Sequence, residues 1–127
     1  MVKIIVDTSV IIDYTRANVG PLSQLIKDSK SGACNLYMPA VVVAELWSGK
    51  ETENNKNANR LEKLLELFKI IDLDRKIAKN SGIISRDCHV SGFDAIVAAT
   101  ALEIGAEVAT SNIKHFSEIK NLKLYQH

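Results

Sequence analysis

Four oxygen-bearing side chains stand in apolar surroundings at separate places in this sequence of 127 residues. Asp7 directly follows an apolar run rich in β-branched residues, and Glu45 is the one polar residue in the segment AVVVAELW. Asp94 lies at the start of FDAIVAATALEIG, and Asn112 lies within ATSNIKHF. If these side chains converge, the three acids need a cation, because like charges in one site raise each other's pKa. Oxygen ligands without histidine or cysteine favour Mg²⁺ or Mn²⁺, so the sequence offers the parts of a metal centre.

Each of these residues also has a purely structural interpretation. Glu45 could form an ion pair with a lysine or arginine, or lie at a boundary where it reaches water. Asp94 follows Ser91 at the spacing of a capping box, and an acid in the first helical turn favours the helix dipole. Asp7 could cap the helix that follows it. Asn112 could be a turn residue or a helix N-cap, which is the simplest interpretation of that residue taken alone.

The elements that must position these residues alternate along the chain. Strands are expected over 2–6, 34–38, 69–73, 107–110 and 122–125. Helices are expected from 8 to about 16–18, over 21–29, 39–49, 61–68 and 93–104, from 74 through 84 with Gly82 as a weak point, and over 113–119, whereas 51–59 is expected to be a surface turn. Strands that alternate with helices predict one α/β domain over residues 1–127, with a parallel sheet of about five strands and helices on both faces.

This topology brings the four side chains together. Asp7 and Asn112 follow the carboxyl ends of two parallel strands, where α/β sheets bind their ligands. The helix that opens with Asp94 leads into the strand 107–110, so its N-terminus lies at the same edge of the sheet. Glu45 lies within about two helical turns of that edge, roughly 8 to 9 Å along the axis. One edge of the sheet is therefore expected to hold the site.

Composition limits how the chain can meet its partners. The formal net charge of +1 is too small to hold nucleic acid by itself, so such contacts require local basic groups or bound cations. Candidates that could hold phosphates, although each could equally be a solvated surface charge, are Lys50, Lys56, Arg60, Arg86 and Lys114. Cys34 and Cys88 are expected to be buried, reduced thiols, which suits a cytoplasmic protein. Neither a signal peptide nor a membrane span is expected.

At this point four segments of the sequence resemble a known family, the PIN domains of the small VapC type. These segments are VDTSVIIDY (6–14), PAVVVAELWSG (39–49), FDAIVAATALEIGA (93–106) and ATSNIKHF (109–116). The resemblance implies a sheet of strand order 3-2-1-4-5. It places the family's acidic positions on Asp7, Glu45 and Asp94, which would hold the metal. Its fourth catalytic position falls on Asn112, where many members have aspartate.

The resemblance also implies a function and partners. It implies that Thr8 and Thr110 supply hydroxyl groups that hold the acids or a metal-bound water. The activity it implies is a Mg²⁺- or Mn²⁺-dependent endoribonuclease, the toxin of a toxin–antitoxin pair. The implied partners are the RNA substrate, a VapB-like antitoxin whose C-terminal segment lies across the pocket, and a second copy of the chain. Helices 41–47 and 61–68 are candidate interfaces, although core packing explains them as well.

Three other interpretations compete with this one. A response-regulator receiver would have paired acids after the first strand and a lysine after the last, and neither pattern is present. A haloacid-dehalogenase-type phosphatase would have DxD at the first strand, where this chain has Ser9. A catalytically silent PIN-like module that only binds RNA or protein remains open. His115 is interpreted as a surface residue near the site, and Trp47 and Phe116 as packing residues.

Overall fold

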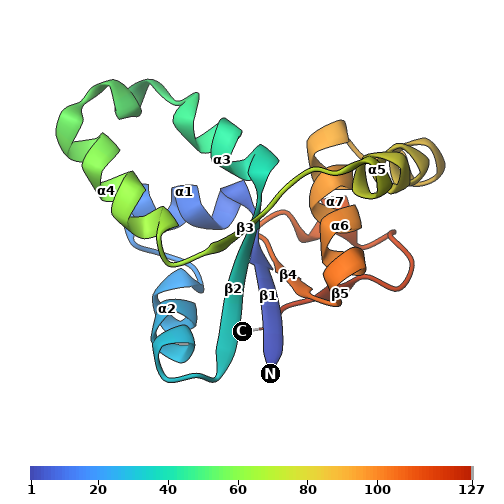
Figure 1. Ribbon diagram of the computed structural model, residues 1–127, viewed down its shortest axis with the longest axis horizontal. Helices are drawn as coiled ribbons and strands as arrows, with labels where there is room; N and C mark the ends of the chain where they lie inside the picture. Colours follow the sequence, from blue (N-terminus) through green and yellow to red (C-terminus); the bar gives the residue numbers. More distant parts are fainter. Residues whose placement is uncertain (127) are drawn as a thin grey trace.

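The computed structural model describes residues 1–126, and its centre is a five-stranded parallel sheet (Figure 1). The strand order is β3-β2-β1-β4-β5, and every neighbouring pair is parallel. The strands are β1 (Val2–Val6), β2 (Cys34–Pro39), β3 (Lys69–Ile71), β4 (Glu107–Ala109) and β5 (Lys123–Leu124). Both the predicted α/β class and the strand order implied by the family resemblance are confirmed.

The helices cover both faces of this sheet. They are α1 (Thr8–Ala17), α2 (Leu22–Lys30), α3 (Ala40–Trp47), the short 3₁₀ helix η1 (Lys50–Glu53), α4 (Asn55–Leu65), α5 (Arg75–Cys88), α6 (Gly92–Ile104) and α7 (Ile113–Phe116). Figure 1 shows α1, α2 and α4 on one side of the sheet and α5, α6 and α7 on the other. The carboxyl ends of β1 and β2 therefore open between two groups of helices.

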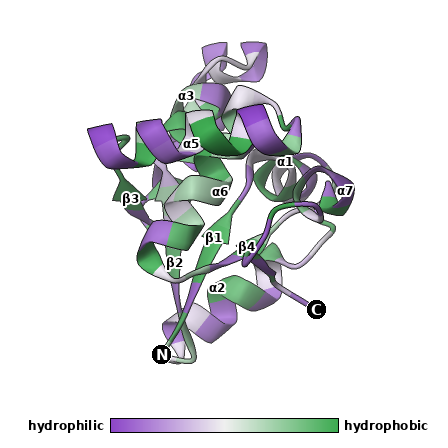
Figure 2. Ribbon diagram, turned by 90° about the vertical axis from the view of Figure 1, so that its right-hand side faces the viewer, coloured by the Kyte–Doolittle hydropathy of each residue, from purple (hydrophilic) through white to green (hydrophobic). Residues whose placement is uncertain are grey.

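The central strand β1 and the helix α6 lie at the middle of a core to which most other elements contribute. Ile4, Ile5 and Val6 of β1 are buried on both faces, as the continuous apolar run predicts. Helix α6 is apolar on nearly all sides, and it is therefore buried between other elements. It packs against β1 and β2 on one side and against α5 on another. In Figure 2, which looks at α5 from outside, that helix carries both hydrophilic and hydrophobic residues along its length. Burial of α6 fixes where its first turn lies.

The structure corrects several predicted boundaries. The polar segment 51–59 is not a turn throughout: η1 occupies its start, and α4 already begins at Asn55. Asn54 explains this, because its side chain accepts hydrogen bonds from the backbone N–H groups of Lys56 and Asn57 at 2.8 and 3.2 Å and so caps α4. Helix α4 ends at Leu65, and α5 continues through Gly82 to Cys88. Helix α7 and strands β3 and β5 are shorter than predicted.

The two cysteines are free, as predicted. Cys34 is buried, but the expected burial of Cys88 is wrong, because Cys88 ends α5 and is partly exposed. Among the residues described, no helix is both long and apolar enough to cross a membrane. The predicted cytoplasmic location stays a prediction.

Candidate metal centre

Asp7 lies at the junction between β1 and α1 and is almost fully buried, with 4% of its surface exposed. Its backbone N–H extends the sheet by donating to the carbonyl oxygen of Ala109 at 3.0 Å. Its Oδ1 accepts from the backbone N–H of Thr8 at 2.8 Å, so Asp7 does cap α1. Its Oδ2 accepts from the hydroxyl groups of Ser9 at 3.1 Å and Thr110 at 2.9 Å. Asp7 is thus a cap and also a carboxylate held in one orientation.

The hydrogen bonds to Asp7 do not fully offset the cost of burying its charged carboxylate. Burial is the largest effect and raises the pKa of Asp7 above its ordinary value. The negative charge of Asp94 raises this pKa further, whereas the hydrogen bonds from Thr110, Ser9 and the Thr8 backbone lower it. Asp7 and Asp94 therefore lie close enough to repel each other. A cation between them would relieve both the burial cost and the repulsion.

Glu45 joins this site through Thr8. It lies in the second turn of α3 and is partly buried. Its Oε1 accepts from the hydroxyl group of Thr8 at 2.8 Å, while the backbone of Thr8 holds Asp7. Within residues 1–126, no lysine or arginine forms an ion pair with Glu45, so the ion-pair interpretation of this acid is wrong. Thr8 and Thr110 each donate a hydroxyl hydrogen bond to an acid, Glu45 and Asp7 respectively. Their role at a metal site stays a prediction.

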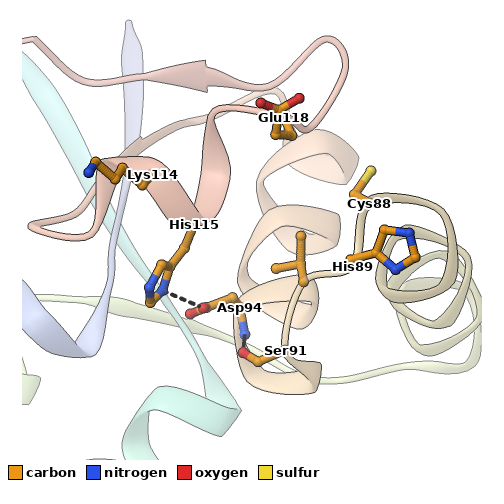
Figure 3. Close-up of a pocket in the computed structure, with 8 residues that line it drawn as sticks. Cys88, His89, Ser91, Asp94, Lys114, His115 and Glu118 are labelled. Atoms are coloured by element: carbon orange, nitrogen blue, oxygen red, sulfur yellow. Dashed lines mark hydrogen bonds and ion pairs between the residues drawn. The ribbon is translucent and has the colours of Figure 1, made fainter.

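Asp94 enters the site from the first turn of α6. Its backbone N–H donates to the hydroxyl group of Ser91 at 3.3 Å, which is one half of the predicted capping box. The carboxylate does not complete that box, because its Oδ2 accepts from Nδ1 of His115 at 3.0 Å (Figure 3). The side chain of Asp94 is 18% exposed and that of His115 is 55% exposed. His115 therefore lies on the surface and also orients an acid of the site.

Asn112 reaches the same edge of the sheet, although not through its side chain. Its backbone N–H donates to the hydroxyl group of Thr110 at 2.9 Å, so Thr110 connects Asn112 with Asp7. Asn112 precedes α7 without a side-chain capping bond, and the residue is exposed. The N-cap interpretation thus holds for its position but not for its side chain. That the amide takes part in the site stays a prediction.

Three polar residues at this edge escaped the sequence analysis. The hydroxyl group of Ser111 donates to Oδ2 of Asp13 at 2.6 Å, and its backbone N–H donates to the hydroxyl oxygen of Ser9 at 3.0 Å. These bonds fasten the segment after β4 to α1. A signal was available, because Ser9 and Asp13 are four residues apart and so share one helix face. No sequence pattern pointed to Ser111.

Of the basic and aromatic residues considered in the sequence analysis, some lie near the acids of the site and others do not. Arg86 forms its ion pair with Asp87 at 2.7 Å, away from the acids of the site. Lys114 is the one of the five proposed phosphate-binding cations that lines a pocket together with Asp94. Phe116 is 1% exposed and therefore packs in the core, as predicted.

The donor set fits a hard divalent cation. Among residues 1–126, no three acidic, histidine or cysteine side chains stand close enough together to form a ready-made metal cage. Mg²⁺ rarely needs one, because it keeps several waters and binds one or two carboxylates together with substrate phosphates. Asp7 and Asp94 supply two mutually repelling carboxylates, and Glu45 is tied to the first of them. Direct binding of a metal by all three acids stays a prediction.

The strand order and the acids at the carboxyl edge together define a class: a parallel α/β domain with an acidic candidate metal centre. The family model described as PIN domain matches residues 4–122. The chain therefore belongs to the PIN domain family.

Individual relatives agree with this assignment. Ribonuclease VapC2 of Rickettsia felis is 30% identical over 96 residues, which cover 70% of this chain and 72% of the relative. The structure of VapBC2 from Rickettsia felis bound to a DNA fragment from its promoter matches with a TM-score of 0.81 at 22% identity, over 97% of both chains. DNA-bound VapBC from Salmonella typhimurium matches with a TM-score of 0.85 at 20% identity, over 98% of both chains. These solved structures share the fold of this chain.

Proposed function

We propose that this protein is a Mg²⁺- or Mn²⁺-dependent endoribonuclease that hydrolyses RNA phosphodiester bonds as the toxin of a VapBC-type toxin–antitoxin pair. The observation that carries the proposal is the placement of Asp7 after β1 and of Asp94 in the first turn of α6, near enough for the charge of Asp94 to raise the pKa of Asp7, with Glu45 tied to Asp7 through Thr8. The name of the VapC2 relative, a ribonuclease, supports the substrate class.

Asp7, Asp94 and Glu45 hold the metal in this proposal. A bound divalent cation supplies an activated water and relief of charge on the phosphate and the leaving oxygen. The protein's own part is to fix the carboxylates before the substrate arrives. Thr8 orients two of them, through its backbone N–H and its hydroxyl group, and Thr110 orients Asp7 from the segment that follows the neighbouring strand β4. The carboxylates act as ligands and not as covalent nucleophiles.

His115 and Asn112 have supporting roles. Nδ1 of His115 donates to Asp94, so this ring nitrogen orients the acid and does not take a proton from water. Asn112 contributes an amide oxygen without charge. With all three acids ionised, the site carries a formal charge of about −3, compared with −4 for a site with a fourth acid.

The proposed partners follow from the same acidic site. A carboxylate-lined site is a natural receptor for arginine, whose guanidinium binds carboxylates through two parallel hydrogen bonds. The antitoxin is therefore proposed to place an arginine there, and the VapBC complexes among the structural relatives support an antitoxin partner. A homodimer is also proposed. Core packing accounts for Val42 and Leu46 of α3 and for Leu61 and Leu64 of α4, so any interface must use other residues of these helices.

The chemistry is tested with a labelled single-stranded RNA in the presence of Mn²⁺ or EDTA. We expect cleavage only with the metal. Because the nucleophile is water, a 2′-O-methyl group at the cleaved nucleotide should leave cleavage intact. Cleavage in EDTA, or cleavage that requires the 2′-hydroxyl group, contradicts the mechanism. A wild-type chain that binds RNA or an antitoxin but never cuts is the silent PIN-like module.

A further inference from the structure

An open pocket of about 410 Å³ lies against the acidic site and shares Asp94 with it. Its walls come from the end of α5, the start of α6, and α7 with the residues after it (Figure 3). The side chains that matter here are Cys88, His89, Asp94, Lys114, His115 and Glu118. The metal mechanism uses only two of these residues, Asp94 and His115, and leaves the rest of the pocket without a role.

We propose that this pocket binds the nucleotide adjacent to the scissile phosphate and contributes to the choice of RNA sequence. The inference rests on the proposed ribonuclease activity. An RNA strand whose phosphate lies at Asp94 has this pocket beside that phosphate, because the same carboxylate lines both. A volume of about 410 Å³ lies within the range of small-ligand sites, which begins at about 300 Å³.

The lining matches an unpaired nucleotide better than an apolar ligand. Lys114 and His89 lie on opposite sides of the pocket and offer a cation and an imidazole ring (Figure 3). Glu118 offers a hydrogen-bond acceptor for the exocyclic amino group of a base. Buried Val90 and the thiol of Cys88 add apolar surface between these groups. Single-stranded RNA is read in this way, by stacking on rings such as histidine and by hydrogen bonds to the edges of the bases.

His89 is the most informative residue of the pocket. It caps the end of α5 with a left-handed backbone, at a φ of 56°, and its N–H donates to the carbonyl oxygen of Ser85 at 3.1 Å. Glycine is the residue that this backbone conformation favours. The histidine side chain is therefore not needed for the turn, and its ring is available for the pocket. Replacing His89 with glycine therefore removes the ring from the pocket and keeps the helix end folded.

The test uses Cys88 as a reporter, because it lines the pocket while Cys34 is buried. Alkylation of Cys88 by iodoacetamide is followed by mass spectrometry in the Asp7→Asn variant, with and without decameric homopolymer RNAs. This variant is chosen because it is not expected to cut RNA, and gels confirm that the RNA stays intact. We expect at least one RNA to slow alkylation about tenfold at saturation, with different affinities for different bases.

Two substitutions in the same background assign the protection to the pocket. His89→Gly should weaken the binding of the protecting RNA about tenfold, which is the effect of one lost base contact, and should leave the melting temperature unchanged or raised. Lys114→Gln should weaken binding more than Lys120→Gln, which removes the same charge from an exposed position outside the pocket.

The possible failures are distinguishable. If wild-type protein cuts RNA but no RNA protects Cys88, the pocket inference is wrong and the ribonuclease stands. If RNA protects Cys88 but wild-type protein never cuts with Mn²⁺, the ribonuclease proposal fails and the pocket inference survives. If His89→Gly binds RNA as tightly as its parent, or if an arginine-rich peptide protects Cys88 and RNA does not, the pocket does not bind a nucleotide.

Discussion

Thr110, the residue directly after β4, donates a buried side-chain hydrogen bond to the Asp7 carboxylate, and removal of this bond has a predictable cost. Thr110→Val keeps the shape of the side chain but deletes the 2.9 Å hydrogen bond to the Asp7 carboxylate. It also deletes the acceptor of the Asn112 backbone N–H. A hydrogen bond to a charged group contributes about 1.5–3 kcal/mol to stability. We therefore expect the free energy of unfolding to fall by about 2 kcal/mol at pH 7.

Thr100 offers a matched control. It is also buried, with 2% of its surface exposed compared with 8% for Thr110, and its hydroxyl group donates to the carbonyl oxygen of Ile96 at 2.7 Å. Since that acceptor is neutral, Thr100→Val should cost only about 1 kcal/mol. With an unfolding entropy of about 2.1 cal/mol/K per residue, 1 kcal/mol corresponds to about 4 °C in a chain of 127 residues. The two variants should therefore melt about 8 °C and about 4 °C below wild type.

The loss of stability should depend on pH for Thr110→Val and not for Thr100→Val. The Thr110 hydrogen bond lowers the pKa of Asp7, so it stabilises the ionised carboxylate. Its contribution is therefore present above the pKa of folded Asp7 and is lost as the pH falls through that value. Burial has raised this pKa above its ordinary value near 3.8, so the deficit of Thr110→Val should begin to shrink while the pH is still above about 4. The deficit of Thr100→Val should stay constant, because a backbone carbonyl does not titrate.

Urea unfolding followed by circular dichroism between pH 4 and pH 8, in EDTA, measures both deficits. Equal and constant deficits for the two variants would mean that Asp7 is not a charged hydrogen-bond acceptor at neutral pH.

Further predictions concern the metal, the amide at position 112 and a glycine inside α5. Mn²⁺ at one hundred times its dissociation constant should stabilise wild type by about 2.7 kcal/mol, and an unchanged melting temperature with no calorimetric binding would count against the site. Asn112→Asp should tighten Mn²⁺ binding yet lower the metal-free melting temperature, and calorimetry that finds neither effect would make Asn112 a turn residue only. Gly82→Ala should raise stability by about 0.5–1 kcal/mol, since an added Cβ meets nothing within 4 Å there. Gly105→Ala should lower it, because φ is 69° there, and thermal melts that reverse this order would contradict the argument.

The sequence predicted the position of the acids better than their contacts. Parallel topology alone puts the ends of β1 and β4 and the start of α6 at one edge, so Asp7 and Asp94 could be placed together without coordinates. Hydrogen-bond partners depend on side-chain directions at loops, where no periodicity exists. For that reason the contact between Asp94 and His115, and the bond from Ser111 to Asp13, were not foreseen.

The predicted boundaries of helices were wrong where the local sequence suits two kinds of structure. A cluster of asparagines suits both a turn and a helix start, and the chain uses Asn54 as the cap of α4. Gly82 looked like a weak point, yet α5 continues through it because the helix is anchored by buried residues such as Ile77 and packs along α6. In both cases tertiary packing and capping overrode local propensity.

RNA cleavage by matched acid variants measures whether Asp7 and Asp94 form a catalytic metal centre. The rate of cleavage with saturating Mn²⁺ is compared for wild type, Asp7→Asn, Asp94→Asn and Asp28→Asn, the last of which neutralises an acid on α2 outside the site. Loss of a metal ligand should cost more than about a hundredfold, the upper range for residues that only support ligands. We predict that the two site variants lose at least this much while they stay folded, and that Asp28→Asn cuts at the wild-type rate. Cleavage at the wild-type rate by either site variant would contradict the account.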